Sequence, residues 1–174
     1  ITLYGESLTS EFKYRRLSSR LRVKIPNIRS LTIANIFFVD NEGLLRANEK
    51  EVLQDLLCAS EGLREHKPED ILFLVVPRLG TISPWASKAT DIAHNCGLQR
   101  VRRIERGIAH QVSFVSETSA REKELVADLI HDQMTETVLH SVDHGAALFD
   151  QKSPGNLTLV DVLTGGFLAL VKAN

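Results

Sequence analysis

Two neighbouring residues, His94 and Cys96, come closest in this sequence to a thiol nucleophile with its base. A covalent catalyst of that kind needs a thiolate activated by an adjacent histidine. In a segment that predicts a helix, residues two positions apart point in different directions. We therefore expect Cys96, like Cys58, to pack as a small apolar side chain and His94 to be an ordinary helix residue. No catalytic residue is predicted in this chain.

Three histidines in the second half have spacings from which a metal site can be built. His140 and His144 lie four positions apart, and His131 precedes His140 by nine. No acidic or cysteine partner at a recognised spacing and no HExxH pattern accompanies them, and no GxxxxGK[ST] phosphate loop occurs in the chain. The histidines are interpreted as solvated side chains, with no metal and no cofactor bound by this chain.

The segment that begins at Ser83 is the best candidate for recognition of another molecule. Ser83 followed by Pro84 is typical of a helix start, because Pro at the first helical position loses no needed hydrogen bond. Lys88, Asp91 and Asn95 then share one face at helical spacing. The opposite face carries an apolar stripe formed by Trp85, Ala89, Ile92 or Ala93, and Cys96.

Three interpretations of this helix remain open. Its polar face can dock a partner. Its amino terminus, with Arg78 just upstream and Lys88 one turn in, can hold a phosphate or carboxylate, since helix N-termini attract anions. The third interpretation is a plain surface helix whose Lys88 and Asp91 form a pair worth about 0.2–0.5 kcal/mol.

The first half of the chain predicts strand, helix, strand, helix. Residues 2–4 form a short strand, and Thr9 or Ser10 caps a helix that ends at Pro26. Residues 31–39 form the second strand, whose alternation shifts near Asn35 and suggests a bulge. The following helix begins with a capping box and buries four apolar residues. The box is Asn48 with Glu51, and the buried residues are Val52, Leu53, Leu56 and Leu57.

The second half repeats the same order. Residues 71–76 form an apolar strand, the Ser83 helix ends at Gly97, and residues 101–115 form a long strand broken at Gly107. Ser119 and Glu122 then make a capping box before a long helix. Its apolar positions recur every fourth residue as Val126, Ile130, Met134, Val138 and Val142.

Together, these elements predict an α+β fold made of a duplicated strand-helix-strand-helix unit. Each unit alone would expose an apolar face, so pairing of the two units into one mostly antiparallel sheet under a helical layer is expected. Residues 150–156 are polar and turn-rich. We predict a domain over residues 1–149 and the start of a linker over residues 150–174.

Composition and charge exclude several classes of protein. Hydrophobic residues make up 43% and charged residues 25% of the 174 residues, which is the balance of a globular domain. The net charge of -1 gives no positive electrostatic potential that would attract nucleic acid or an anionic membrane. No apolar run approaches the roughly 20 residues that span a bilayer, and the start does not have the pattern of a signal peptide. A cytoplasmic protein, cut from a longer one, is expected.

The most distinctive stretch, residues 77–98, reads PRLGTISPWASKATDIAHNCGL and is followed by RIERGIAH. It resembles the signature near the amino terminus of single-chain phosphoribosylformylglycinamidine synthases. The matching positions are Pro77, Arg78, Gly80, Thr81, Ser83, Pro84, Trp85, Ser87, Lys88, Ala89, Thr90 and Asp91. Ala86 stands where that family commonly has serine. Residues 134–139 and 160–163 also look like this family.

The resemblance implies the amino-terminal domain of a much larger ligase. The intact enzyme would convert formylglycinamide ribonucleotide, ATP and glutamine to formylglycinamidine ribonucleotide, ADP, phosphate and glutamate, with Mg²⁺ and ATP bound elsewhere. Partners would be the synthetase and glutaminase domains of the same polypeptide, reached through an ammonia path. In multi-chain forms a small dimeric subunit takes the place of this domain, which agrees with the duplication.

On this interpretation, the chain is a scaffold and coupling domain without activity of its own. The alternative is a small-molecule-binding regulatory module, since compact duplicated units can bind ligands. The residues expected at a substrate site or an interdomain contact are Arg78, Thr81, Ser83, Trp85, Ser87, Lys88, Asp91 and Asn95.

Overall fold

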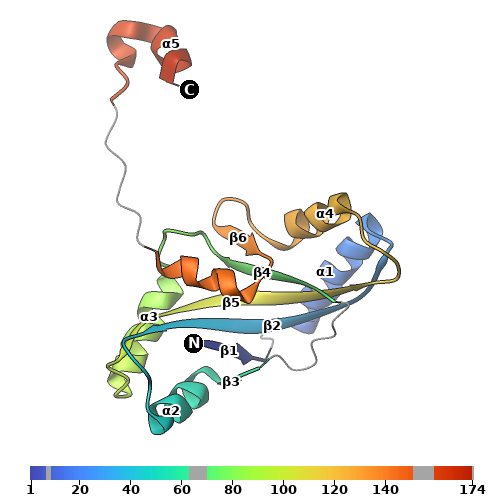
Figure 1. Ribbon diagram of the computed structural model, residues 1–174. Helices are drawn as coiled ribbons and strands as arrows, with labels where there is room; N and C mark the ends of the chain where they lie inside the picture. Colours follow the sequence, from blue (N-terminus) through green and yellow to red (C-terminus); the bar gives the residue numbers. More distant parts are fainter. Residues whose placement is uncertain (7–8, 63–69, 151–158, 174) are drawn as a thin grey trace.

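The computed structural model describes residues 1–6, 9–62, 70–150 and 159–173. Figure 1 shows the strands side by side in one twisted sheet, with α2 and α3 near one end and α1 and α4 near the other. The elements are β1 (Thr2–Gly5), α1 (Glu11–Lys24), β2 (Ile28–Asn41), α2 (Ala47–Leu57), β3 (Ala59–Ser60), β4 (Ile71–Pro77), α3 (Pro84–Asn95), β5 (Val101–Phe114), α4 (Ala120–Ile130), β6 (Glu136–Leu139), the 3-10 helix η1 (Val142–Phe149) and α5 (Val162–Ala173).

The sheet has six strands in the order β3-β1-β2-β5-β4-β6, and every pairing among them is antiparallel. β2 and β5, each of 14 residues, pair along nearly their whole length at the centre. The predicted α+β class and antiparallel sheet under a helical layer are therefore confirmed.

The order of the strands shows the duplication directly. Outward from the centre, β2, β1 and β3 on one side correspond to β5, β4 and β6 on the other. The two helices that follow the central strands, α2 and α4, have 11 residues each. The registers also agree, because Leu3 lies opposite Phe37 as Phe73 lies opposite His110. Each half is thus the predicted strand-helix-strand-helix unit, followed by one further edge strand.

The four helices α1 to α4 pack on one face of the sheet, in two separate clusters. Because side chains alternate along a strand, the odd-numbered residues of β2 from 31 to 39 share that face. At one end they meet α2 and α3 through Phe37, Val39, Leu53, Ala93 and Ile104. At the other end they meet α1 and α4 through Leu21, Leu31, Ile33, Val112 and Val126.

The opposite face carries a third cluster that was not predicted. η1 covers it, and Leu148 packs against apolar side chains of the central strands. Gly145 allows this close approach, since a Cβ there would lie 2.1 Å from a ring carbon of Phe38. The rest of the cluster is Ile36, Leu74, Val76, Ala109 and Leu139.

Three predicted helix starts are confirmed and one is wrong. Ser10 caps α1, Ser83 caps α3, and Ser119 forms a capping box with Glu122 at α4. Hydrogen bonds from the backbone and hydroxyl of Ser119 lower the pKa of the Glu122 carboxyl. α2 begins earlier than predicted, because the N-cap is Arg46, whose N–H donates to the Glu49 carboxylate at 2.7 Å.

The predicted burial on α2 is also wrong in part. Leu53 is buried and Leu56 and Leu57 are partly buried, but Val52 remains 40% exposed. The helix buries a narrower stripe than the sequence pattern suggested, because only one side of it meets the sheet.

The predicted long helix after Ser119 is wrong. α4 ends at Ile130, and the chain returns to the sheet as β6 and then forms η1. Asp132 makes the turn, since its carboxylate accepts the Met134 N–H at 2.8 Å and its carbonyl accepts the N–H of Glu136. The β-branched residues Thr137 and Val138 then pair with β4. Of the predicted apolar series, Val126 and Ile130 lie in α4, whereas Val138 lies in β6 and Val142 begins η1.

Two predicted irregularities in the central strands are also absent. β2 pairs with β5 without interruption at Asn35, and its register shifts lie near Ile28 and Asp40. The alternation of apolar and polar residues is interrupted near Asn35 because both faces of β2 are covered there. Gly107 does not break β5, but a Cβ at this position would lie 2.9 Å from the Val75 carbonyl oxygen. The glycine is needed for close packing of the strands.

The carboxyl-terminal part contains α5, whose backbone kinks at Gly166 with φ 55° and ψ −150°. Its large apolar side chains are exposed, including Leu163 and Phe167. The predicted linker covers residues 150–174, of which residues 151–158 and 174 lie outside the described residues. Within the described residues, no helix is both long and apolar enough to cross a membrane.

His110 is a titratable side chain in the core, 3% exposed on β5. β5 is a central strand of the sheet, so this residue does not lie at a sheet edge. Burial lowers the pKa of His110 from 6.5 to about 4, against a smaller opposing effect of a backbone hydrogen bond at Ile108. The imidazole is therefore neutral in the folded protein at pH 7.

Acid should destabilise the fold through His110. Because the folded pKa lies below the unfolded value, its stabilising contribution is present above pH 6.5 and is lost as the pH falls towards 4. Between pH 7 and pH 4, we expect the free energy of unfolding to fall by about 3 kcal/mol more in the native protein than in His110→Gln. Urea unfolding at several pH values measures this, and His144→Gln, at an exposed position, should keep the native slope. Equal slopes for His110→Gln and the native protein would contradict it.

Candidate functional site

The segment between β4 and α3 begins with a tight turn at residues 78–81. The carbonyl of Arg78 accepts the Thr81 N–H at 3.2 Å and the Thr81 hydroxyl at 2.6 Å. Gly80 has φ +81°, as a type II turn requires at its third position. The Gly and Thr of the Pro-Arg-x-Gly-Thr pattern are therefore explained by the geometry of this turn, which leads into α3.

A buried carboxylate fixes the start of α3. Glu105 of β5 is fully buried, and its carboxylate accepts the Ser83 N–H at 3.3 Å and the Ser83 hydroxyl at 2.8 Å. Ser83 in turn accepts the Ala86 N–H at 3.0 Å as the helix cap. Glu105 thus holds the capping residue from outside the helix.

Arg103 neutralises this carboxylate and ties it to the turn. Its Nε donates to Glu105 at 3.0 Å, and its terminal nitrogen donates to Glu105 and to the Thr81 carbonyl, the latter at 2.7 Å. The guanidinium lies 5.5 Å from the ring centroid of Phe149 in η1. We call Thr81, Ser83, Arg103 and Glu105 the latch cluster.

Two further contacts bind α3 to β5 along its length. The Thr90 hydroxyl donates to the Ala86 carbonyl at 2.8 Å and accepts the Ile104 N–H at 3.1 Å. At the other end of the helix, His94 Nε2 lies 2.6 Å from the Val101 carbonyl oxygen. The buried residues of α3 are Ala86, Thr90 and Ala93, and Trp85 and Ala89 pack against the same cluster. The predicted stripe is therefore confirmed at Trp85, Ala89 and Ala93 and is wrong at Cys96, which is exposed.

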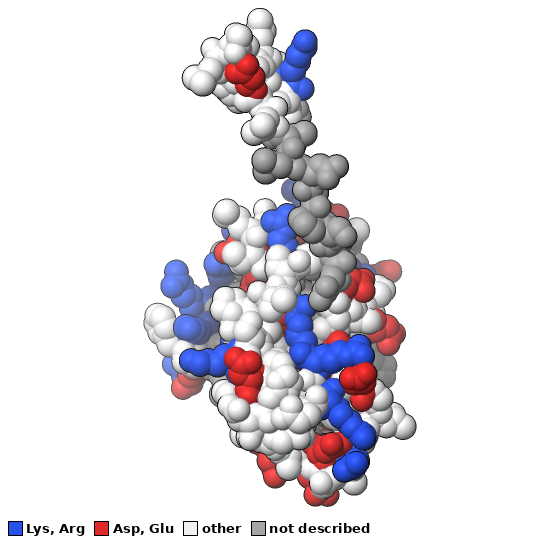
Figure 2. Space-filling model, turned by 90° about the vertical axis from the view of Figure 1, so that its left-hand side faces the viewer, with Lys and Arg blue, Asp and Glu red and all other residues white. Residues whose placement is uncertain are grey.

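The polar face of α3 points to solvent. Ser87, Lys88, Asp91 and Asn95 are all exposed, and their side chains make no hydrogen bond or ion pair in the part of the chain that the structure describes. Figure 2, from the side of α2 and α3, shows charges of both signs scattered over this part of the surface. The predicted Lys88 to Asp91 pair does not form.

Trp85 lies between this polar face and the core. Its ring stacks on Phe37 with centroids 5.7 Å apart, and the Arg106 guanidinium lies 5.0 Å from its centroid. The remaining surface of Trp85 lines a groove of about 200 Å³ between α2 and α3. The other residues of the groove are Leu56, Leu57, Lys88, Ala89 and Ile92. The Trp85 ring therefore packs on the core on one side and lines the groove on the other.

The predicted anion site at the start of α3 does not assemble. Two donors of that start, the N–H and hydroxyl of Ser83, already bind Glu105. Arg78 donates to the carbonyl of Met134, in the turn before β6, at 3.4 Å, whereas Lys88 lines the groove beside α2. The two cations expected to flank one anion thus lie in different surroundings, and only Arg78 has a hydrogen-bond partner among the described residues.

The remaining candidates for chemistry are separated in the structure. Cys58 and Cys96 are free and exposed at helix ends, where the sequence predicted small core side chains. The His94 ring is bound to Val101 rather than to Cys96. His140 and His144 do not share a helix, because β6 ends just before His140. Among the described residues, no cluster of three His, Cys, Asp or Glu side chains could hold a metal.

Sequence reasoning missed Arg103 and Glu105, although both stand in the distinctive RIERGIAH stretch. Charged residues on a strand are usually exposed, so residue type alone gives no reason to expect a buried Glu105. The only available signal was that a central strand, covered on both faces, carried two charges that need an internal partner.

A comparison with known proteins identifies one family. The family model described as formylglycinamide ribonucleotide amidotransferase N-terminal matches residues 34–149. The match runs from the middle of β2 to the end of η1 and includes the whole of α3 and the latch cluster.

Removal of the buried carboxylate should be costly. Glu105→Ala leaves Arg103 and the Ser83 donors without their partner, and we expect the free energy of unfolding to fall by about 3–5 kcal/mol. Chemical denaturation measures the loss, and amide hydrogen exchange should rise first across residues 78–88. The control is Arg102→Ala, which breaks an exposed pair with Glu42 at 3.6 Å and should cost less than about 1 kcal/mol. Similar losses in both variants would show that the latch cluster has no special role.

Proposed function

The chain belongs to the formylglycinamide ribonucleotide amidotransferase N-terminal family, and from this premise we propose that it is the scaffold and coupling domain of that enzyme. Its family is the N-terminal part of a purine-biosynthetic amidotransferase. Other domains or subunits of that enzyme are therefore its partners. The specific role rests on the face that α3 presents.

One observation carries the proposal. The polar face of α3 is exposed and unpaired within the described residues, yet the helix beneath it is fixed at three places. The latch cluster holds its start, Thr90 its middle and His94 its end. A rigid helix loses little conformational entropy when its side chains bind, which favours recognition over a purely structural role.

In the proposed function, this face meets the synthetase part of the enzyme near its nucleotide substrate. Lys88 and Asp91 offer one charge of each sign, and Ser87 and Asn95 offer neutral donors and acceptors. Trp85 and the groove beside α2 supply an apolar contact next to these charges. The arrangement, an apolar centre with a polar rim, is that of a protein interface.

The reaction and its cofactors belong to this proposal as well. The intact enzyme would join ammonia from glutamine to formylglycinamide ribonucleotide with ATP and Mg²⁺, and the site for these groups would lie in the synthetase and glutaminase parts. Residues 150–174 would begin the linker towards them. This chain would set the position of those parts and contribute no reacting group.

Charge reversal on α3 should uncouple the enzyme. In the intact amidotransferase, Lys88→Glu or Asp91→Lys should lower glutamine-dependent product formation about tenfold, the equivalent of about 1.4 kcal/mol at an interface. Glutamine hydrolysis measured alone should stay near the native rate. Lys13→Glu, an exposed change on α1, serves as the matched control. Parallel loss of both activities, or an equal effect of Lys13→Glu, would contradict the coupling role.

The isolated chain should have no turnover. Purified residues 1–174 should release glutamate from glutamine, and phosphate from ATP, at the rate of a blank without protein. A scaffold domain holds none of the reacting groups, which is the reason for this expectation. Turnover that survives repurification and saturates with substrate would overturn the assignment of the chemistry to other domains.

A further inference from the structure

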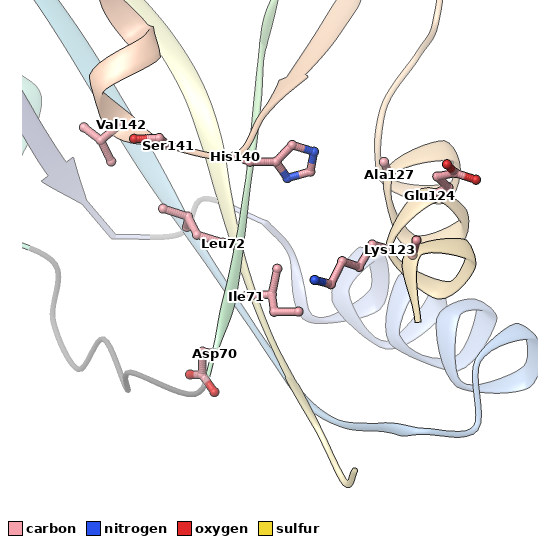
Figure 3. Close-up of a pocket in the computed structure, with 10 residues that line it drawn as sticks. Asp70, Ile71, Leu72, Lys123, Glu124, Ala127, His140, Ser141 and Val142 are labelled. Atoms are coloured by element: carbon pink, nitrogen blue, oxygen red, sulfur yellow. The ribbon is translucent and has the colours of Figure 1, made fainter. Parts of the chain in front are cut away.

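A second candidate site lies beside α4, away from the α3 face. It is a cavity of about 730 Å³ between α4, the start of β4 and the segment that follows β6. This volume is within the range of small-molecule pockets, roughly 300–1,000 Å³. Figure 3 shows the Lys123 ammonium directed into this space and the His140 ring facing it from the other side. The apolar residues of the cavity include Ile71, Leu72 and Val142.

Comparison of the two halves shows which charged group has no partner in this cavity. Lys50 is the fourth residue of α2, and Lys123 is the fourth residue of α4. In the first half, Glu61 directly follows β3 and pairs with Lys50 at 3.4 Å. The register places His140, which directly follows β6, at the position equivalent to Glu61, since Ser60 lies opposite Tyr4 as Leu139 lies opposite Leu74.

The two halves therefore differ in charge at one equivalent place. The first half has a lysine and a carboxylate, and the second has a lysine and an imidazole. Among the residues that the structure describes, Lys123 makes no ion pair. A carboxylate from outside the chain would restore at Lys123 the pairing that Glu61 provides at Lys50, and the His140 ring could donate a second hydrogen bond.

A second part of the cavity contains a hydrogen-bond acceptor without a donor. Asp70 lines it, and its Oδ1 is buried without a hydrogen-bond partner. A buried acceptor without a donor costs about 1–3 kcal/mol, so a ligand N–H that reaches it is favoured. Leu72 also lines the cavity, and it pairs only with Gln111 of β5, because β6 pairs with β4 only from Leu74 to Pro77.

We propose that this cavity binds a free α-amino acid. Its carboxylate would pair with Lys123 and His140, its ammonium would donate to Asp70, and its side chain would lie against Ile71 and Val142. A ligand with only one charge would leave one end of the cavity unsatisfied. The site lies apart from α3, so it does not depend on the role proposed for that helix.

Calorimetric titration of the 174-residue chain tests the proposal, with L-glutamine, L-glutamate, L-alanine and acetate as probes. At least one amino acid should bind with a saturable heat, and acetate should bind at least tenfold more weakly. Lys123→Ala and His140→Glu should each weaken the amino acid at least tenfold, the second because it recreates the internal pair of the first half. Asp70→Asn should weaken the amino acid more than acetate.

Lys50→Ala is the matched control, since it removes the equivalent lysine from the other half. Its affinity for the amino acid should stay within twofold of the native chain, and thermal unfolding of each variant shows that the fold is retained. Absence of heat with every amino acid would overturn the proposal. So would acetate bound as tightly as the amino acids, or an equal loss in Lys50→Ala and Lys123→Ala.

Discussion

The antiparallel pairing of β2 with β5 is the interaction on which the rest of the structure depends. It joins the two halves over about 14 residues on each strand, and both faces of the resulting ribbon are covered. α2 and α3 meet it at one end and α1 and α4 at the other, while η1 covers the reverse side. Gly107 lies near the middle of this pairing and has no room for a side chain. The latch cluster begins on β5, so the position of α3 also follows from this strand.

Local signals in the sequence were enough to predict the repeating unit. Ser10, Ser83 and Ser119 cap helices because each offers a side-chain oxygen to free backbone N–H groups, and this chemistry is visible in the residue type. The apolar run of β4 and the length of β5 likewise depend on residue type alone. Prediction failed where a long-range partner decided the outcome. The Asp132 turn and the β-branched Thr137 and Val138 favour a strand only locally, and β6 forms because the edge of β4 is available to pair with it.

The candidate site shows the same division. The exposure of Lys88, Asp91 and Asn95 follows from helical spacing and was predictable. The burial of Glu105 was not, because a carboxylate on a strand is stable inside only if Arg103 and Ser83 lie against it in three dimensions. Trp85 is intermediate, since its stacking on Phe37 depends on how α3 packs against β2. Residue identity indicates which groups can interact, while topology decides which groups meet.

The central pairing also has a consequence for how the polypeptide emerges during synthesis. Asn35 lies opposite Ile108, which is added to the chain 73 residues later. At a synthesis rate of about 5–20 residues per second, roughly 4–15 s pass between the synthesis of β2 and that of β5. Throughout that interval the nascent first half carries an open strand edge and an uncovered apolar face. Until β5 has been synthesised, this edge would have to be shielded, either by a ribosome-bound chaperone or by transient contacts within the first half.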